Sequence, residues 1–423
     1  MKVFKFGGAS VKDAVAVKNV SHILSLFGGE KRTVIISAMG KTTNEMEKIV
    51  DALWTNDKKI FLELVNDRLQ FHLAILNELF TEKHFSIYTE VENLFENLKN
   101  KFDQPRSSNF DFEYDQIVSL GEVISTLIVT AFLREEGHSV TWADSRQLIR
   151  TNNTYREGLV DWNTTENLIN TKFLSEFKKF DIQVTQGFIG HTSEGFTTTL
   201  GREGSDYTAG IFAYCCNAES VTIWKDVPGM LNADPKWFDN TVKLDSISFS
   251  EAIELAYYGA TVIHPKTIKP LQNKGIPLYV KSFINPHSEG TIIQESTERD
   301  HLIPSFIFKM NQLYLSITPK DFSFIVEENL SDIFNRLASV NAKINLMQNS
   351  ALSFSVALDQ DKIDIQKLLE IFQETYNVEY TEGLELVTIR HYDQATIERV
   401  TESKEVIVEQ KTQQTVRFIL KDI

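Results

Sequence analysis

The sequence predicts an α/β protein: a parallel sheet with flanking helices, followed by two small ferredoxin-like (βαββαβ) units. Three observations carry this prediction. The chain opens with a strand, a glycine turn, a helix and a second strand within residues 2–37. A second strand–glycine–helix corner occupies Thr197–Gly210. Beyond Pro304, short strands alternate with helices in an imperfectly repeated β-α-β-β-α-β order.

The composition is that of a globular protein of about two or three domains. Of its 423 residues, 42% are hydrophobic and 24% charged, and the net charge is -15. This charge argues against a nucleic-acid binder and a basic membrane-surface protein. Its two cysteines, Cys215 and Cys216, are adjacent, so we expect no disulfide framework, no metal cluster and a cytoplasmic location. We also expect no membrane-spanning stretch.

The elements follow in order along the first part of the chain. Residues 2–6 alternate like a strand and run into Gly7-Gly8, after which an amphipathic helix extends to Gly28. A buried-strand run at 32–37 leads into a polar loop and then a helical lobe at about 45–101. One strongly apolar helix is expected at 115–133.

Later elements complete this domain and begin the next. We expect strands at 139–142, 182–189 and 220–227, helices at 250–258 and after His264-Pro265, and a last strand at 276–283. The predicted boundaries are 1–290 for the α/β domain, 291–304 for a linker and 305–423 for the two ferredoxin-like units.

The glycine corner at Thr197–Gly210 is a candidate anion site. Ser205 stands where a helix N-cap belongs, and Asp206 falls in the first turn. Free backbone N–H groups at a helix start attract anions, and Arg202 adds a positive charge. An ordinary surface turn with an Arg–Asp pair explains the same residues.

Further polar residues stand at strand ends, where open α/β sheets bind ligands. Lys5 precedes Gly7-Gly8, whose bare backbone allows a phosphate chain to approach closely. Ser37 and Thr43 follow the second strand, and Lys225-Asp226 ends a later one. Alternatively, the lysines are ordinary surface residues, and the hydroxyl groups only stabilise turns and cap helices.

Glu122 interrupts an apolar helix face, and a buried carboxylate needs a cationic partner. That partner is either the ammonium group of a ligand or an internal Arg or Lys. Trp224 is expected in the core, and His264 is expected to cap a helix rather than bind a metal.

Six stretches together resemble the signature motifs of aspartate kinases, in the family's order over residues 1 to about 290. They are KFGGASV (5–11), SAMGKTTN (37–44), GREGSDYTA (201–209), WKDVPG (224–229), ADP (233–235) and GATVIHP (259–265). The resemblance implies the amino acid kinase fold, a three-layer α/β/α sandwich, followed by paired ACT domains. It also implies phosphorylation of the β-carboxylate of L-aspartate by ATP to 4-phospho-L-aspartate, towards lysine, threonine and methionine.

The resemblance also implies residue roles. Lys5 and Asp206 would be catalytic. The aspartate would be held by Ser37, Thr43, Glu122, Arg202 and Ser205. The nucleotide would be held by Gly7, Gly8, Ser10, Lys225, Asp226, Leu231, Lys236 and Thr261. Mg²⁺ is expected on the phosphates and water, without a protein cage.

Three departures from the family's kinase motifs stand out. Ala9 replaces a threonine, and Glu203 replaces a glycine of the GRGGSD motif. Thr261 replaces a lysine that many relatives use on the phosphates, whereas Lys225 stands where they often have threonine. We hypothesise that the positive charge has moved from 261 to 225.

The ACT region carries candidate effector residues, Asn345, Asn349 and Ser350. Lysine-inhibited relatives often have an aspartate matching Asn345, so lysine feedback, another effector and insensitivity all remain open. A strand near 305–310 implies an interleaved ACT pair, and ACT edge pairing implies a homodimer. The chain leaves no room for a homoserine dehydrogenase unit, so a monofunctional enzyme is expected.

Two other functions stay open. One is another amino acid kinase, acting on glutamate or a carbamate; Arg202, Glu122 and the ACT region argue against it. The other is a catalytically weak amino-acid-sensing subunit, which Glu203 and the relocated lysine would explain.

Overall fold

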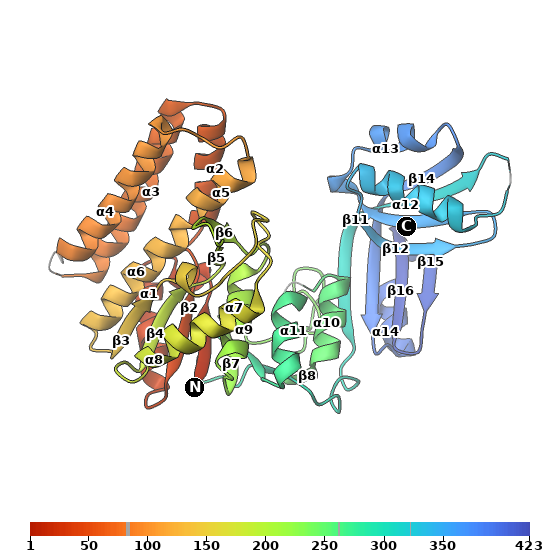
Figure 1. The fold of residues 1–423 in the computed structure, drawn as a ribbon. Coiled ribbons are helices and arrows are strands. Elements are labelled where there is room, and N and C mark those ends of the chain that lie inside the picture. Colours follow the sequence, from red (N-terminus) through yellow and green to blue (C-terminus); the bar gives the residue numbers. More distant parts are fainter. Residues whose placement is uncertain (82–84, 261–262, 322) are drawn as a thin grey trace. The chain divides into compact units, whose positions relative to one another are not determined.

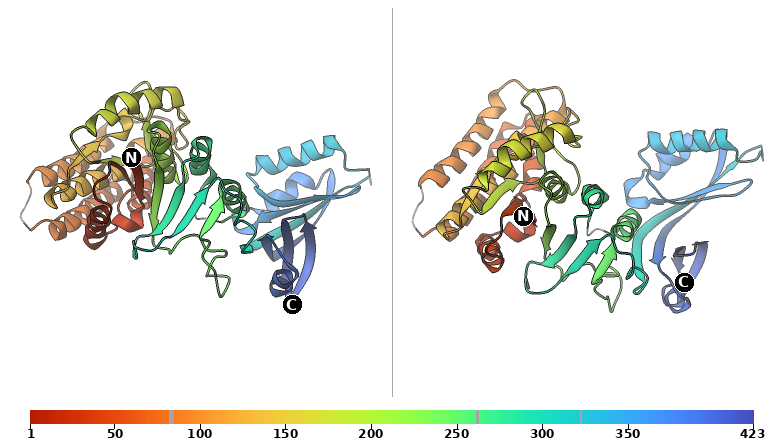
Figure 2. Two further views of the ribbon diagram at one scale, coloured as in Figure 1. Left: turned by 90° about the horizontal axis from the view of Figure 1, so that it is seen from below. Right: turned by 60° about the horizontal axis from the view of Figure 1, so that its bottom comes forward.

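The computed structural model describes residues 1–81, 85–260, 263–321 and 323–423. The chain forms two compact units, drawn in Figure 1 and Figure 2. The first comprises Met1–Met230, Lys243–Ile253 and Val262–Thr297. The second comprises Leu231–Val242, Glu254–Thr261 and Glu298–Ile423.

An eight-stranded sheet forms the centre of the first unit, in the order β3-β4-β2-β1-β7-β9-β10-β8. Its strands are β1 (Lys2–Phe6), β2 (Arg32–Ile36), β3 (Val140–Ala143), β4 (Ile182–Gln186), β7 (Ser220–Lys225), β8 (Ser246–Ser248), β9 (Leu278–Ser282) and β10 (Thr291–Gln294). From β3 to β9 all neighbours pair in parallel. Every residue of β2 is buried, because helices cover both faces of the sheet.

Helices form the two outer layers. α1 (Ala14–Leu26) and α6 (Leu120–Glu135) pack on the face that carries Phe4 and Val34. Lys5 points to the opposite face, where α9 (Gly204–Cys215) packs against β1 and β7, and α11 (Pro265–Lys274) packs against α9. This is the three-layer α/β/α sandwich that the sequence predicts (Figure 1).

The remaining elements of this unit surround the sheet. The helical lobe consists of α2 (Thr42–Trp54), α3 (Lys58–Leu79), α4 (Phe85–Asn100), η2 (Lys101–Asp103) and α5 (Phe110–Val118). Short connecting elements are η1 (Gly8–Val11), η3 (Ser145–Gln147), α7 (Trp162–Leu168), η4 (Ile169–Phe173), α8 (Leu174–Glu176), and the hairpin of β5 (Ile189–His191) and β6 (Thr197–Thr199). α10 (Phe249–Tyr258) follows β8 directly.

The apolar helix expected at 115–133 is two helices, α5 and α6, which meet at Ser119. Ser119 keeps a helical backbone, so both belong to one stretch, Phe110–Glu135, long and apolar enough to cross a membrane by length and composition. The expectation that no stretch approaches the length of a transmembrane helix was therefore wrong. However, 78% of its most apolar window is buried inside the protein, as in the core helix of a globular domain.

The strand at Leu278–Ser282 is not the last of the first unit. Thr291–Gln294, which the sequence assigns to a linker, forms β10, antiparallel to β9 and parallel to β8. Thr291 and Ile293 are fully buried. The strand was missed because its alternating pattern is only four residues long.

A six-stranded antiparallel sheet forms the second unit, in the order β12-β13-β11-β14-β16-β15. Its strands are β11 (Ser305–Pro319), β12 (Ile344–Asn349), β13 (Phe354–Asp359), β14 (Tyr376–Arg390), β15 (Lys404–Lys411) and β16 (Thr415–Asp422). Its helical elements are α12 (Glu327–Ser339), η5 (Gln360–Lys362), α13 (Ile365–Phe372) and α14 (Gln394–Thr401).

The long strand β11 takes part in both halves of this sheet. Its first part, Ser305–Lys309, pairs with the end of β14. After a register shift, residues 312–317 pair with β13 on one side and with the start of β14 on the other. Separate apolar cores form on the two halves, one with α12 and α13 and the other with α14.

Candidate active site

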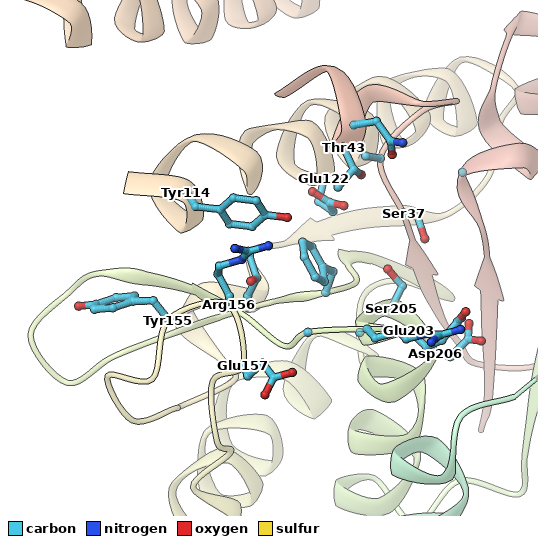
Figure 3. A pocket seen from close by; sticks show the side chains of 18 of the residues that line it. Ser37, Thr43, Tyr114, Glu122, Tyr155, Arg156, Glu157, Glu203, Ser205 and Asp206 are labelled. Carbon is cyan, nitrogen blue, oxygen red and sulfur yellow. The ribbon is translucent and has the colours of Figure 1, made fainter. Parts of the chain in front are cut away.

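A cavity of about 860 Å³ opens in the first unit beyond the carboxyl ends of β1 and β2 (Figure 3). Seven of the predicted binding and catalytic side chains line it together with Gly8. These seven are Lys5, Ser37, Thr43, Glu122, Arg202, Ser205 and Asp206. The sequence therefore identified side chains that the fold brings to one place.

The glycine turn after β1 allows its neighbours to approach closely. A Cβ on Gly8 would lie 2.8 Å from the carbonyl oxygens of Ala38 and Gly40. A Cβ on Gly7 would lie 3.3 Å from the Lys5 Nζ. The missing side chains thus let the two strand-end loops touch and leave room for the lysine ammonium group.

Asp206 lies between two lysines at the start of α9. Its Oδ1 is 2.7 Å from Lys5 Nζ, and its Oδ2 is 3.7 Å from Lys225 Nζ. Burial alone raises the pKa of Asp206, but the two lysines outweigh it, and the pKa lies below its ordinary value. Asp206 is fully buried and the Lys5 side chain only 9% exposed, so this ion pair is weakly screened.

Glu203 points inward to the same charges. It lines the cavity beside Asp206 (Figure 3). Burial raises its pKa above the ordinary value, and the charge of Asp206 adds to this effect, while Lys225 and Lys5 oppose it. The loop thus carries two carboxyl groups against two lysines.

Glu203, not Ser205, is the N-cap residue of α9. The prediction for Ser205 as the cap was wrong. Glu203 adopts a left-handed backbone with φ 54°, as does Gly201 with φ 75°, and α9 begins at Gly204. The turn therefore ends two residues earlier than the N-cap preference of serine indicates.

Glu122 is a buried residue of α6. Its Oε2 atom has no hydrogen-bond partner among the described residues. Burial raises its pKa to about 8, although backbone hydrogen bonds from Glu122 and Ala38 act in the other direction. No protein Arg or Lys pairs with it in the described part of the chain, so the internal salt bridge is not formed. An unpaired carboxyl oxygen in a ligand-sized cavity suits an ammonium group.

The residues predicted to bind the nucleotide lie in several parts of the structure. Ser10 is buried, and its hydroxyl donates to the Trp224 carbonyl at 3.5 Å, so it joins η1 to β7. Asp226 is exposed beyond the end of β7. Leu231 and Lys236 belong to the second compact unit. Thr261 lies outside the described residues.

Two predictions for structural residues were confirmed. Trp224 is 1% exposed, within the core of the sheet. His264 caps α11, where its Nδ1 accepts a hydrogen bond from the Lys266 N–H at 3.1 Å.

Sequence reasoning missed one wall of the cavity. Tyr114 of α5 and the loop residues Tyr155, Arg156 and Glu157 line it. Asp115 is fully buried and accepts hydrogen bonds from the Arg156 N–H at 2.9 Å and the Thr199 hydroxyl at 2.7 Å. No motif marks these residues; the acidic pair at positions 111 and 115 on one helix face was the available signal.

Known proteins resemble the chain over most of its length. The amino acid kinase family matches residues 1–282. Lysine-sensitive aspartokinase 3 of Escherichia coli (strain K12) is 33% identical over 395 residues, which cover 92% of this chain and 86% of that protein. The chain belongs to the aspartokinases of the amino acid kinase family.

Further aspartokinases agree with this assignment. Aspartokinase 2, chloroplastic, of Arabidopsis thaliana is 29% identical, over 92% of this chain and 71% of that protein. A crystal structure of E. coli aspartokinase III in complex with lysine and aspartate matches with a TM-score of 0.84 and 29% identity. The match covers 99% of this chain and 95% of the chain in that crystal structure.

In this aspartokinase the candidate effector residues lie on and after β12. Asn345 is enclosed by its own chain: Lys309 Nζ donates to its Oδ1 at 2.7 Å, and its Nδ2 donates to Asp359 Oδ1 at 2.6 Å. Asn349 is exposed, and the Ser350 hydroxyl hydrogen-bonds that of Ser353 at 2.8 Å.

Proposed function

We propose that this aspartokinase transfers the γ-phosphoryl group of MgATP to the β-carboxylate of L-aspartate, giving 4-phospho-L-aspartate. The observation that carries the proposal is the pairing of two features in one cavity. One is the ion pair of Lys5 and Asp206, with Lys225 next to Asp206 outside the cavity lining. The other is the buried, unpartnered Oε2 of Glu122. The first suits phosphate and the second suits an α-ammonium group.

The chemistry needs positioning more than acid–base catalysis. The nucleophilic carboxylate is already ionised at neutral pH, so no general base is required. The difficulty lies in bringing this anion up to a triphosphate, so positive charge must offset the repulsion. Lys5 would stabilise the transferring phosphoryl group, and Asp206 would orient Lys5 and Lys225 rather than accept a proton.

The aspartate would be held by its remaining groups. Glu122 would receive the α-ammonium group, and Arg202 would bind the α-carboxylate through a forked pair of hydrogen bonds. The hydroxyl groups of Ser37, Thr43 and Ser205, all at the cavity wall, would orient the β-carboxylate.

The nucleotide would approach along the glycine turn and Lys225. The turn at Gly7 and Gly8 has no side chains that would block a phosphate chain. Mg²⁺ would neutralise phosphate charge and be held by phosphate oxygens and water, since no group of three His, Cys, Asp or Glu gathers among the described residues.

Regulation and assembly belong to the second unit in this proposal. Asn345, Asn349 and Ser350 would face an amino-acid effector. β12 and β15 are the edge strands of the six-stranded sheet, so edge pairing would join two copies into a cytoplasmic homodimer. Light scattering after size-exclusion chromatography would measure the dimer.

A hydroxylamine-trapping assay tests the activity. We expect aspartyl hydroxamate from L-aspartate and ATP, and none above background from glutamate or N-acetylglutamate. An Asp206→Asn variant should lose at least about 100-fold in kcat, because it no longer orients the lysines. Preference for glutamate would favour another amino acid kinase, and no product from any substrate would favour a sensing subunit.

A further inference from the structure

Arg156 lines the cavity but has no role in the function proposed above. Its backbone is left-handed, with φ 65°, a conformation that favours glycine. Its side chain is 47% exposed. An arginine in a glycine-like conformation at a cavity wall indicates that its side chain is used there.

One face of α5 holds this arginine in place. The Tyr114 ring centroid is 4.3 Å from the Arg156 guanidinium carbon, and Asp111 Oδ1 lies 3.4 Å from its Nη1. Asp115 accepts the Arg156 backbone N–H at 2.9 Å. Positions 111, 114 and 115 share a helix face, so three side chains of one helix fix one residue.

The loop that carries Arg156 touches the glycine corner before Arg202. A Cβ on Gly201 would lie 3.3 Å from the Arg156 carbonyl oxygen, and the Gly158 N–H donates to the Thr199 carbonyl at 2.8 Å. Two arginines therefore come from adjoining segments at the same cavity. Each has a planar guanidinium that binds a carboxylate through two parallel hydrogen bonds.

The position of Glu122 indicates which substrate group Arg156 meets. An α-ammonium and an α-carboxylate are bonded to the same carbon, so the groups that bind them must lie close together. In Figure 3 the Arg156 side chain extends beside Tyr114 into the cavity, on the side where Glu122 lies. Although Tyr114 and Asp111 contact it, the Arg156 side chain remains partly exposed.

We propose, resting on the aspartate kinase function above, that Arg156 binds the substrate α-carboxylate from the α5 side, beside Arg202. It acts as a specificity-determining residue. The site thereby requires an amino acid with a free α-carboxylate as well as the carboxylate to be phosphorylated.

The test combines a variant with a substrate that lacks the charge in question. Arg156→Gly removes the guanidinium and suits the left-handed backbone. L-Aspartic acid α-amide keeps the β-carboxylate but has no α-carboxylate. We expect Arg156→Gly to lower kcat/KM for aspartate about 10- to 100-fold and to change it less than about threefold for the amide. KM for ATP should stay unchanged, and Arg156→Lys should be intermediate, because it keeps the charge but not the fork.

Arg68→Ala is the matched control. Arg68 also stacks on an aromatic ring, 4.5 Å from the Phe71 centroid, but lies outside the cavity lining. It should change neither substrate's kinetics. If the amide is not turned over, its inhibition constant against aspartate replaces kcat/KM.

Equal losses with both substrates would assign Arg156 a structural role and overturn the proposal, as would no loss with either. A melting temperature of Arg156→Gly at or above that of the parent protein shows that the loop still folds. Absence of aspartyl hydroxamate with the parent protein would instead refute the function on which the proposal rests.

Discussion

At the scale of single residues, Glu122 would couple the proposed aspartate binding to pH. Burial raises its pKa from 4.5 to about 8. Folding therefore takes up a proton between these values, and this group's contribution to the free energy of unfolding falls as the pH rises from 4.5 to 8. A bound ammonium group would lower the pKa of Glu122 again, so we expect Glu122 to release a proton when aspartate binds. The KM for aspartate should therefore fall as the pH rises from 6 to 8. Calorimetry in buffers of different ionisation enthalpy measures the proton release.

Glu122→Gln separates these two effects. We expect KM for aspartate to rise about 10- to 150-fold through loss of a charge-assisted hydrogen bond. We also expect the melting temperature of the ligand-free variant to exceed that of the parent protein at pH 8 but hardly at pH 5. An equal difference at both pH values would show that Glu122 does not titrate between them.

Glu203 would oppose the polyphosphate of the proposed nucleotide beside Lys5. Glu203→Gly removes a carboxyl group from beside Lys5 and Lys225 and suits the left-handed backbone. We expect KM for ATP to fall about threefold to tenfold at pH 8. The effect should be smaller at pH 6, because the raised pKa of Glu203 leaves more of it neutral there.

Glu203→Gln is the control for this prediction. It removes the charge and keeps the strained backbone, so it should lower KM without the gain of about 1 kcal/mol in unfolding free energy expected for glycine. A higher KM for ATP in either variant would mean that the carboxylate assists nucleotide binding.

The sequence predicted the residues whose local pattern is unusual. Lys5 and Asp206 stand at glycine corners, and Glu122 interrupts an apolar helix face. Arg156 carries no such mark, because its place depends on a loop packing against Gly201. The direction of Glu203 likewise depends on a backbone angle that no residue preference encodes.

At the scale of elements, the loops that follow β1 and β2 pack directly against each other at Gly8. We expect Gly8→Ala to lower kcat at least about 100-fold, because its Cβ would meet two carbonyl oxygens at 2.8 Å and separate the loops around Lys5. Gly28→Ala is the matched control, since its Cβ would meet only the Ser25 carbonyl oxygen at 3.6 Å. Steady-state kinetics with circular dichroism would compare them, and an active Gly8→Ala would contradict the close approach.

Long buried runs made the central strands predictable, whereas short edge elements were not. β2 is apolar or β-branched after Arg32 and buried throughout, so it was recognisable as an inner strand of a parallel sheet. β10 has only four residues, and it is recognisable as a strand only from its pairing with β8 and β9. A pairing partner as distant in sequence as β8 leaves no local pattern.

At the scale of the whole molecule, the second unit carries a half-buried lysine where an effector's ammonium group would bind. Lys309 Nζ donates to Asn345 Oδ1 at 2.7 Å, and burial lowers the pKa of Lys309. An effector lysine directed to Asn345 must displace this ammonium group first. The chain's own lysine would therefore compete with such an effector.

We expect free lysine to inhibit the parent enzyme weakly, and Lys309→Met to lower the half-inhibitory concentration at least about tenfold, since a vacated amide oxygen accepts the effector's ammonium group. Lys362→Met is the control. Lys362 contacts the same network through Asp359 Oδ2 at 2.6 Å, but its side chain is 73% exposed, so its loss should leave the response unchanged. Equal lysine sensitivity of parent and Lys309→Met would show that the effector, if any, does not use Asn345.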